Sequence, residues 1–300
     1  MINFAGRTAF VTGGANGVGI GLVRALLAEG CTVAMADIRQ DALDTALTSL
    51  DNAEVMGIQV DVSSRDAMAK AADEVEARFG PVTLLFNNAG VNLFQTIEES
   101  SYTDWDWLMG VNLHGPINGV MTFVPRMIAH GQGGYIVNTA SMAGWLASGN
   151  PGIYNTTKFA VRGLSESLRY SLAKHSIGVS CVCPGLVKSH IFASDEIRPE
   201  GLMQDAKPVN HEGVKRLAGM HEVGMEPDVI AARILQGMRE NQTYILPMPD
   251  HKEELAEYFQ EVLADYRDYP QDPGYDQRIA IENFRRTSYK EARDAARIAT

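Results

Sequence analysis

The stretch from Thr8 to Gly19 reads TAFVTGGANGVG, a short β-branched run followed at once by a cluster of glycines. Because glycine has no side chain, such a cluster permits a tight turn and close approach of the backbone to a ligand. Where the turn also opens a helix, free N–H groups and the helix dipole favour a phosphate. The stretch therefore predicts a strand, a pyrophosphate-binding turn and the start of a helix, although the glycines alone also fit a turn that binds nothing.

An acidic residue after the next apolar run favours a nucleotide. Asp37 lies 18 residues beyond Gly19, directly behind the run Cys31–Ala36. A carboxylate at this place accepts hydrogen bonds from the adenine-ribose hydroxyls and repels a 2′-phosphate, which predicts NAD rather than NADP. Arg39 stands two residues further on and could attract a 2′-phosphate, so residual use of NADP stays open.

Short apolar runs alternate with longer amphipathic runs over the first 250 residues. This alternation is typical of a parallel sheet covered by crossover helices, and it predicts a doubly wound α/β (Rossmann) fold of about seven strands. The expected strands are Thr8–Val11, Thr32–Met35, Val55–Val60, Val82–Phe86, Gly134–Val137, Val179–Val182 and Thr243–Leu246. Apolar residues recur at helical spacing in Ala67–Phe79, Trp105–Ala129, Ile153–Ala173 and Pro227–Arg239.

The composition changes after two prolines, Pro247 and Pro249. We therefore divide the chain into one domain, residues 1–248, and a charged extension, residues 249–300, which is not an independent domain. Apolar residues at helical spacing predict a helix from about Leu255 to Tyr266, and the run from Tyr269 to Gly274 should break it before a second helix. The extension packs against its own subunit or a neighbour, or else it lines the mouth of the active site.

Charge and composition exclude several partners. The 300 residues carry 26 basic and 37 acidic side chains, a net charge of −11, which opposes binding to nucleic acid or anionic lipid. We expect no membrane span, because no apolar run is long enough, and no signal peptide, because the N-terminus leads directly into the first strand. Three cysteines make no disulfide framework, which indicates a cytoplasmic protein. The seven histidines lack ligand spacing, so we expect no metal and interpret them as surface or locally hydrogen-bonded residues.

Tyr154 and Lys158 are four residues apart on a predicted helix and therefore share a face. A tyrosine titrates near pH 10, but a neighbouring ammonium and a helix N-terminus favour the phenolate and could make it a base near neutral pH. The pair alone is a common coincidence, so its meaning depends on the rest of the sequence.

The sequence resembles the short-chain dehydrogenase/reductase family over about residues 5–248. Several motifs appear in the family's order: the glycine turn, an adenine-contacting pair, a motif after the fourth strand, a helix asparagine, a catalytic serine, the Tyr/Lys pair and a segment that closes over nicotinamide. In this chain they are Thr12–Gly19, Asp61-Val62, Asn87–Gly90, Asn112, Ser141, Tyr154 with Lys158, and Pro184–Ser189. Ser189 stands where threonine is more usual.

The resemblance implies an NAD-dependent alcohol dehydrogenase. Tyr154 would exchange the proton of a substrate hydroxyl, Lys158 would lower the tyrosine pKa and bind the nicotinamide ribose, Ser141 would hold the substrate oxygen, and Asn112 would anchor a water chain. The family is usually a homodimer or homotetramer through its fourth and fifth helices. The implied cofactor-binding residues are Gly13, Asn16, Gly17, Val18, Gly19, Asp37, Ile38, Arg39, Asp61, Val62, Asn88, Ala89, Gly90, Tyr154, Lys158, Pro184, Gly185, Val187 and Ser189.

The loops that bind substrate in this family are apolar and bulky here, which favours a large, mainly apolar or aromatic alcohol. Residues 190–224 are expected to form a lid, with Met203, Met220 and Met225 giving it a flexible apolar surface. The candidate substrate residues are Asn92, Phe94, Met142, Trp145, Ile191 and Phe192.

Several further stretches resemble the Cα-dehydrogenases of bacterial lignin breakdown, which oxidise the benzylic alcohol of β-aryl ethers to a ketone. They include Gly90–Asn92, Thr103–Trp107, Val111–Gly119 and Phe123–Ile128. A dehydrogenase or ketoreductase for another bulky alcohol, such as a steroid or a medium-chain carbinol, is the alternative. A non-catalytic NAD sensor is a remote one, because its expected mark, a lost Tyr, Lys or Ser, is absent.

Overall fold

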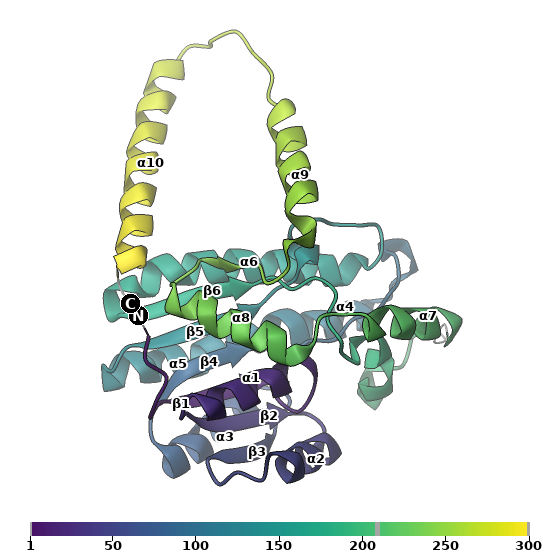
Figure 1. The fold of residues 1–300 in the computed structure, drawn as a ribbon. Helices are drawn as coiled ribbons and strands as arrows, with labels where there is room; N and C mark the ends of the chain where they lie inside the picture. Colours follow the sequence, from purple (N-terminus) through teal and green to yellow (C-terminus); the bar gives the residue numbers. More distant parts are fainter. Residues whose placement is uncertain (1, 208–210, 299–300) are drawn as a thin grey trace.

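A computed structural model describes residues 2–207 and 211–298. Its strands form one parallel seven-stranded sheet with the order β3-β2-β1-β4-β5-β6-β7, so the prediction of a doubly wound sheet is confirmed (Figure 1). The described strands are β1 (Thr8–Thr12), β2 (Thr32–Asp37), β3 (Val55–Gln59), β4 (Val82–Asn87), β5 (Gly134–Thr139), β6 (Ile177–Val182) and β7 (Tyr244–Ile245).

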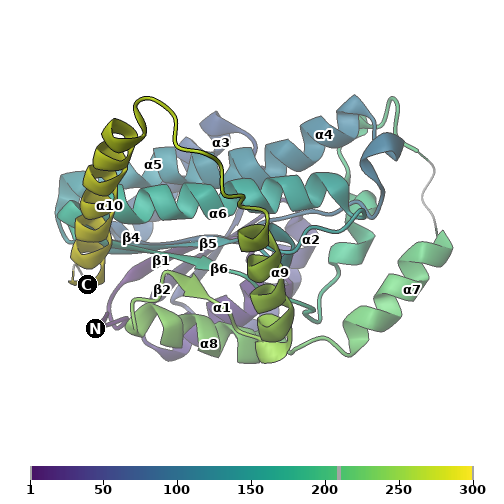
Figure 2. The ribbon, with the colours of Figure 1, turned by 90° about the horizontal axis from the view of Figure 1, so that it is seen from above.

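Helices cover both faces of this sheet. Side chains of α1, α2 and α8 pack on one face with Val11 and Met35, whereas α3, α5 and α6 pack on the other with Phe10 and Ile136. Figure 2 shows α1 and α8 on the opposite side of the strands from α3, α5 and α6. The described α-helices are α1 (Gly17–Ala28), α2 (Gln40–Leu50), α3 (Arg65–Phe79), α4 (Tyr102–Met109), α5 (Gly115–His130), α6 (Gly152–Leu172), α7 (His211–Glu222), α8 (Pro227–Arg239), α9 (Lys252–Ala264) and α10 (Tyr275–Ile298).

The predicted helix Trp105–Ala129 is interrupted. A π-helical segment, Gly110–His114, separates α4 from α5. Within it the Asn112 side chain leaves the helix surface and pairs with the backbone of Val91, accepting from its N–H at 2.8 Å and donating to its carbonyl at 2.9 Å. A π-helical turn contains one residue more than an α-helical turn. The apolar residues before and after Gly110–His114 still recur at helical spacing, so the sequence pattern did not reveal the extra residue.

The extension forms the predicted helix, break and second helix. Helices α9 and α10 rise from the body and are joined at their far ends by residues 265–274 (Figure 1). Part of the predicted lid, residues 208–210, lies outside the described residues, as do Met1 of the predicted domain and residues 299–300 of the extension. Among the described residues, no helix is both long and apolar enough to cross a membrane.

Candidate active site

A cavity of about 760 Å³ lies where β1, β2, β4, β5 and β6 end. The carboxyl ends of parallel strands meet at one edge of a doubly wound sheet, and there the order of the chain reverses between β1 and β4. The cavity runs from the glycine turn after β1, past the loops after β4 and β5, to the segment after β6 and the first turn of α9.

The glycine turn leaves room for a phosphate. Gly13 and Gly17 have positive φ, and a Cβ on Gly13 would lie 2.8 Å from the Ala89 Cα. The residue before α1, Asn16, makes no capping hydrogen bond in the described structure, so its side chain leaves the first N–H groups of the helix uncapped. This arrangement fits a pyrophosphate. Gly19 does not reach the cavity wall: a Cβ there would lie 1.9 Å from the Gly13 carbonyl oxygen, so it supports the turn from beneath.

Asp37 stands at the end of β2 and lines the cavity. Its Oδ2 accepts from the Ala15 N–H and its Oδ1 from the Arg39 N–H, each at 3.2 Å. These bonds hold the carboxylate beside the glycine turn. Next to it, the cavity is lined by Ile38, Arg39, Asp61 and Val62.

Asn88 joins the β4 loop to the glycine turn. Its side chain donates to the Thr12 carbonyl at 3.1 Å, and the Thr12 hydroxyl accepts from the backbone N–H of Asn88 and of Ala89. A Cβ on the following residue, Gly90, would lie 3.5 Å from Lys158 Nζ and 3.4 Å from Asn112 Oδ1. The backbone of this loop therefore passes directly over the buried lysine.

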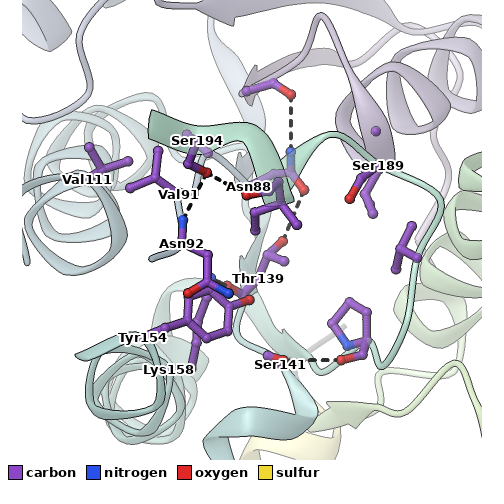
Figure 3. A pocket seen from close by; sticks show the side chains of 18 of the residues that line it. Asn88, Val91, Asn92, Val111, Thr139, Ser141, Tyr154, Lys158, Ser189 and Ser194 are labelled. Carbon is purple, nitrogen blue, oxygen red and sulfur yellow. Dashed lines mark hydrogen bonds between the residues drawn. The ribbon is translucent and has the colours of Figure 1, made fainter. Parts of the chain in front are cut away.

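Tyr154, Lys158 and Ser141 meet at one wall of the cavity (Figure 3). Tyr154 lies in the first turn of α6 and Lys158 one turn further on. Lys158 Nζ donates to the Thr139 carbonyl at 2.9 Å and lies 5.3 Å from the centre of the Tyr154 ring. The Ser141 hydroxyl accepts from the Ala143 N–H, which holds it at the end of β5.

Burial governs the titration of this pair. It raises the pKa of Tyr154 to about 12, with the hydrogen bond to Ser141 acting in the opposite direction. It lowers the pKa of Lys158 to about 8. Desolvation of the phenolate is the main cause of the shift at Tyr154, and the expected lowering of this pKa by Lys158 stays a prediction.

Asn112 lies behind the cavity, 1% exposed, and is not part of its lining. Both ends of its amide hold Val91, and its Nδ2 also lies 3.3 Å from the Thr157 hydroxyl of α6. The residue thus fixes the loop after β4 against the helix that carries Tyr154.

Four of the six candidate substrate residues line the cavity: Asn92, Phe94, Met142 and Ile191. Trp145 does not, because its ring is packed against Arg162, 4.0 Å away, and Tyr244, and its indole N–H donates to Cys183. Phe192 lies outside the lining as well, with its ring centre 5.5 Å from that of His221.

The predicted lid segment contributes to the cavity wall, but not through the three methionines that we expected to line it. Met203, Met220 and Met225 are not among the lining residues, and the first two are about half exposed. The 3₁₀-helical segment Ile191–Ile197 covers the cavity instead, with Ser194, Glu196 and Ile197 on its wall. A buried ion pair anchors the end of this segment: Arg198 Nη1 lies 2.5 Å from Asp104 Oδ1, and both side chains are almost fully buried.

Sequence reasoning missed several polar lining residues. His190, His221 and His251 line the cavity although we expected surface or local roles, and Glu254 joins them. His251 and Glu254 come from the start of the extension, so its first turn contributes to the mouth of the cavity. This position agrees with the alternative that the extension lines the mouth of the active site, although the sequence did not single out these two residues, because their charge alone is typical of a solvated helix.

Comparison with known proteins places these features in a family. The family model for short chain dehydrogenases matches residues 7–199. A C alpha-dehydrogenase of Sphingobium sp. is 40% identical over 283 residues, which cover 93% of each chain. A solved short-chain dehydrogenase from Novosphingobium aromaticivorans is 60% identical over 99% of this chain and all of that chain, with a TM-score of 0.87. A short chain dehydrogenase/reductase from Burkholderia phymatum, solved in complex with NAD, is 33% identical over 91% of this chain and 99% of that chain, with a TM-score of 0.85.

Proposed function

The chain belongs to the short chain dehydrogenase family of oxidoreductases, and from this premise we propose that it uses NAD to oxidise the benzylic Cα-alcohol of a lignin-type β-aryl ether to the ketone. The observation that carries the proposal is the meeting of Tyr154, Lys158 and Ser141 on the wall of the cavity that also holds the glycine turn. The similarity to the C alpha-dehydrogenase of Sphingobium supports the substrate class.

The cofactor end of the cavity fits NAD. The side-chain-free turn at Gly13 and Gly17 would hold the pyrophosphate, and Asp37 would accept hydrogen bonds from the adenine ribose where a 2′-phosphate would be repelled. When bound, NAD supplies the acceptor for a hydride. Lys158, which lies beneath Gly90, would bind the nicotinamide ribose.

The protein residues handle the proton. In the oxidation, the C–H electron pair leaves the carbinol carbon as a hydride, the O–H proton passes to the Tyr154 phenolate, and the C–O bond becomes a carbonyl. Ser141 holds the substrate oxygen while its charge changes. The Lys158 ammonium favours the phenolate electrostatically, and Asn112 fixes the loop over which a water chain would leave Lys158.

Asn92 gives the cavity a specific polar contact. The side chain is 5% exposed, and its buried Oδ1 has no hydrogen-bond partner among the described residues. Asn92 lines the same cavity as Tyr154 (Figure 3), and its backbone N–H donates to the Ser194 hydroxyl at 3.0 Å. Because an unpaired buried acceptor costs free energy, a substrate with a second hydroxyl near the reacting carbon would be favoured.

The proposal is tested by NADH formation with the purified protein and a panel of alcohols. A β-aryl ether with a side-chain hydroxyl next to the benzylic carbon should exceed a steroid alcohol and a simple secondary alcohol in kcat/KM by about 100-fold or more. Turnover of the steroid alcohol but not of the ether would reject the proposed substrate class and support the proposed dehydrogenase reaction. NADH binding without turnover of any alcohol would reject the catalytic role.

Asn92→Leu refines this test. The substitution should lower kcat/KM for the dihydroxylated ether by about tenfold or more. The kcat/KM for the matched ether that lacks the second hydroxyl should change little. Equal losses with both ethers would show that Asn92 does not read that group.

A further inference from the structure

Helices α9 and α10, with the connection 265–274, form an arch that stands away from the sheet (Figures 1 and 2). Both feet of the arch are attached to the body. Phe259 of α9 packs edge-on against Trp145, with ring centres 5.9 Å apart. At the other foot, the Ala296 carbonyl of α10 accepts from Asn241 Nδ2 at 2.9 Å, and Ala296 itself is buried. The arch is therefore held to the body of the protein at both of its ends.

The arch exposes many large apolar side chains. Leu263 is 67% exposed in α9, and Phe284 is 75% exposed in α10. Single exposed apolar residues are normal, whereas their gathering on one element favours a surface that another molecule covers. The others on the arch are Phe259, Val262, Tyr266, Tyr269, Tyr275, Ile279, Ile281 and Tyr289.

The two helices carry opposite charge. Helix α9 has four acidic side chains and one basic, whereas α10 has six basic and four acidic. Among the described residues, neither Glu257 nor Glu261 of α9 forms a salt bridge, and neither do Arg286 and Arg293 of α10; all four are exposed. Glu257 and Glu261 lie one turn apart, and Arg286 and Arg293 two turns apart, so each pair follows one face of its helix.

We propose that the arch is a dimerisation element, in which α9 of one copy packs on α10 of a second copy and the reverse contact forms at the same time. Within one chain the two complementary helices are held apart, as Figure 1 shows, so their faces can meet only between copies. Each arch offers one acidic and one basic helix, which allows a closed two-fold pairing with two identical contacts.

The charges also select this pairing from its rivals. Contact of α9 with α9 of the second copy would bring acidic helices together, and contact of α10 with α10 would do the same for basic ones. An anionic membrane would meet the acidic α9 and a chain with a net charge of −11. The second copy is therefore the occupant that satisfies both the apolar and the charged residues of the arch.

The contact would also bear on the active site. His251 and Glu254, just before and within the first turn of α9, line the cavity mouth, so a partner helix on α9 would hold that wall in place. This consequence rests on the proposed function, but the dimerisation itself does not.

The test reverses the charges of one helix at a time. The α9 variant carries Glu257→Lys and Glu261→Lys, and the α10 variant carries Arg286→Glu and Arg293→Glu. Sedimentation velocity should show wild type in a larger assembly, and each variant alone should dissociate by one step with a Kd raised about tenfold or more. The control, Glu54→Lys with Glu74→Lys on exposed positions of the body, should leave the assembly unchanged.

Mixing the two variants supplies the decisive measurement. An α9 variant and an α10 variant should associate with each other, and the chain with all four substitutions should associate with itself, because both regain opposite charges at each contact. Circular dichroism checks that every variant is folded. A wild-type monomer at micromolar concentration, or single variants that lose assembly without recovery in the mixture, would overturn the proposal, and so would wild-type binding to anionic vesicles as a monomer.

The activity measurement separates this inference from the proposed function. Dissociated variants should raise KM for the bulky ether by about threefold or more while the Kd of NADH stays constant. If the variants lose assembly but their kinetics are unchanged, the proposed dimer contact is supported and its proposed effect on the cavity mouth is rejected. Inactivity of wild type on every alcohol would leave the sedimentation result as it stands.

Discussion

The Lys158 ammonium lies 5.3 Å from the centre of the Tyr154 ring and is held there by a 2.9 Å hydrogen bond to the Thr139 carbonyl. Any effect of the lysine on the phenol would therefore act through space, from a position fixed by the end of β5. Burial raises the pKa of Tyr154 and the hydrogen bond to Ser141 opposes this rise; we propose the Lys158 charge as a second group that favours the phenolate.

Tyr154→Phe removes the group that exchanges the proton while leaving the ring in place. We expect kcat to fall by about 10²- to 10⁴-fold. NADH affinity, followed by fluorescence titration, should change by less than about threefold, because the cofactor contacts remain. Tyr170→Phe on the same helix is the matched control and should retain activity. Substantial turnover by Tyr154→Phe would reject the assignment.

Activity should depend on pH in opposite senses for the two directions. Oxidation needs the phenolate, so its kcat/KM should rise as the pH rises toward the pKa of Tyr154, and ketone reduction, which needs the phenol, should fall through the same range. The Lys158 charge is present below its pKa of about 8, so Lys158→Met, which removes that charge, should lower oxidation in that range and move the oxidation limb to higher pH. Profiles from about pH 6 to about pH 11 would measure the shift. Superimposable profiles would show that Lys158 does not tune the phenol.

Asp37→Ala should narrow the preference for NAD over NADP by about tenfold or more in kcat/KM, because the substitution removes the charge that repels a 2′-phosphate and leaves Arg39 beside the site. Arg39→Ala should not favour NADP. An unchanged NAD/NADP ratio in Asp37→Ala would contradict the role of this carboxylate.

Arg198→Ala should destabilise the protein by about 3–5 kcal/mol, because it leaves the Asp104 carboxylate buried and unpaired. Although burial opposes it, hydrogen bonds from Ser101, Arg198 and Gln95 keep the pKa of Asp104 below its ordinary value. The stability from this group is thus present above the unfolded pKa and is lost as the pH falls through the folded one.

Urea unfolding at neutral and acidic pH would measure the loss. Arg24→Ala breaks the exposed Arg24–Asp228 pair and should cost less than about 1 kcal/mol, so it serves as the control. Similar losses for the two variants would show that the buried pair does not anchor the lid segment.

The sheet could be predicted because each strand is an apolar run of limited length and each crossover has a helical period. Thr8–Gly19 added a local signal, since only glycines fit where backbones approach within contact distance, as at Gly13 and Ala89. The position of Asp37 after the next apolar run indicated the nucleotide, and the resemblance to the family implied that the β4 loop and Tyr154 belong to the same site.

The rest depended on tertiary contacts that no local pattern carries. Trp145 was expected at the substrate, but its indole N–H donates to Cys183, just after β6, and its ring packs against Arg162 of α6. The pKa of Tyr154 depends on how deeply the assembled fold buries it, which sequence spacing does not encode. Glu254 of α9 and His251 just before it line the cavity together with residues that follow β4, β5 and β6, a proximity that exists only in the assembled fold.

The widened turn at Gly110–His114 also determines how α5 is rotated about its axis relative to α4. An α-helix turns by about 100° per residue, so deleting one residue there would restore a regular helix and rotate α5 by about that angle relative to α4. Asn118 of α5 donates to the Val62 and Ser63 carbonyls. If α4 kept its present packing contacts after the deletion, Asn118 would face away from these two carbonyls. Deletion of one residue in this segment should therefore disturb the packing of α5 more than a substitution there, because the deletion changes the direction of every side chain that follows.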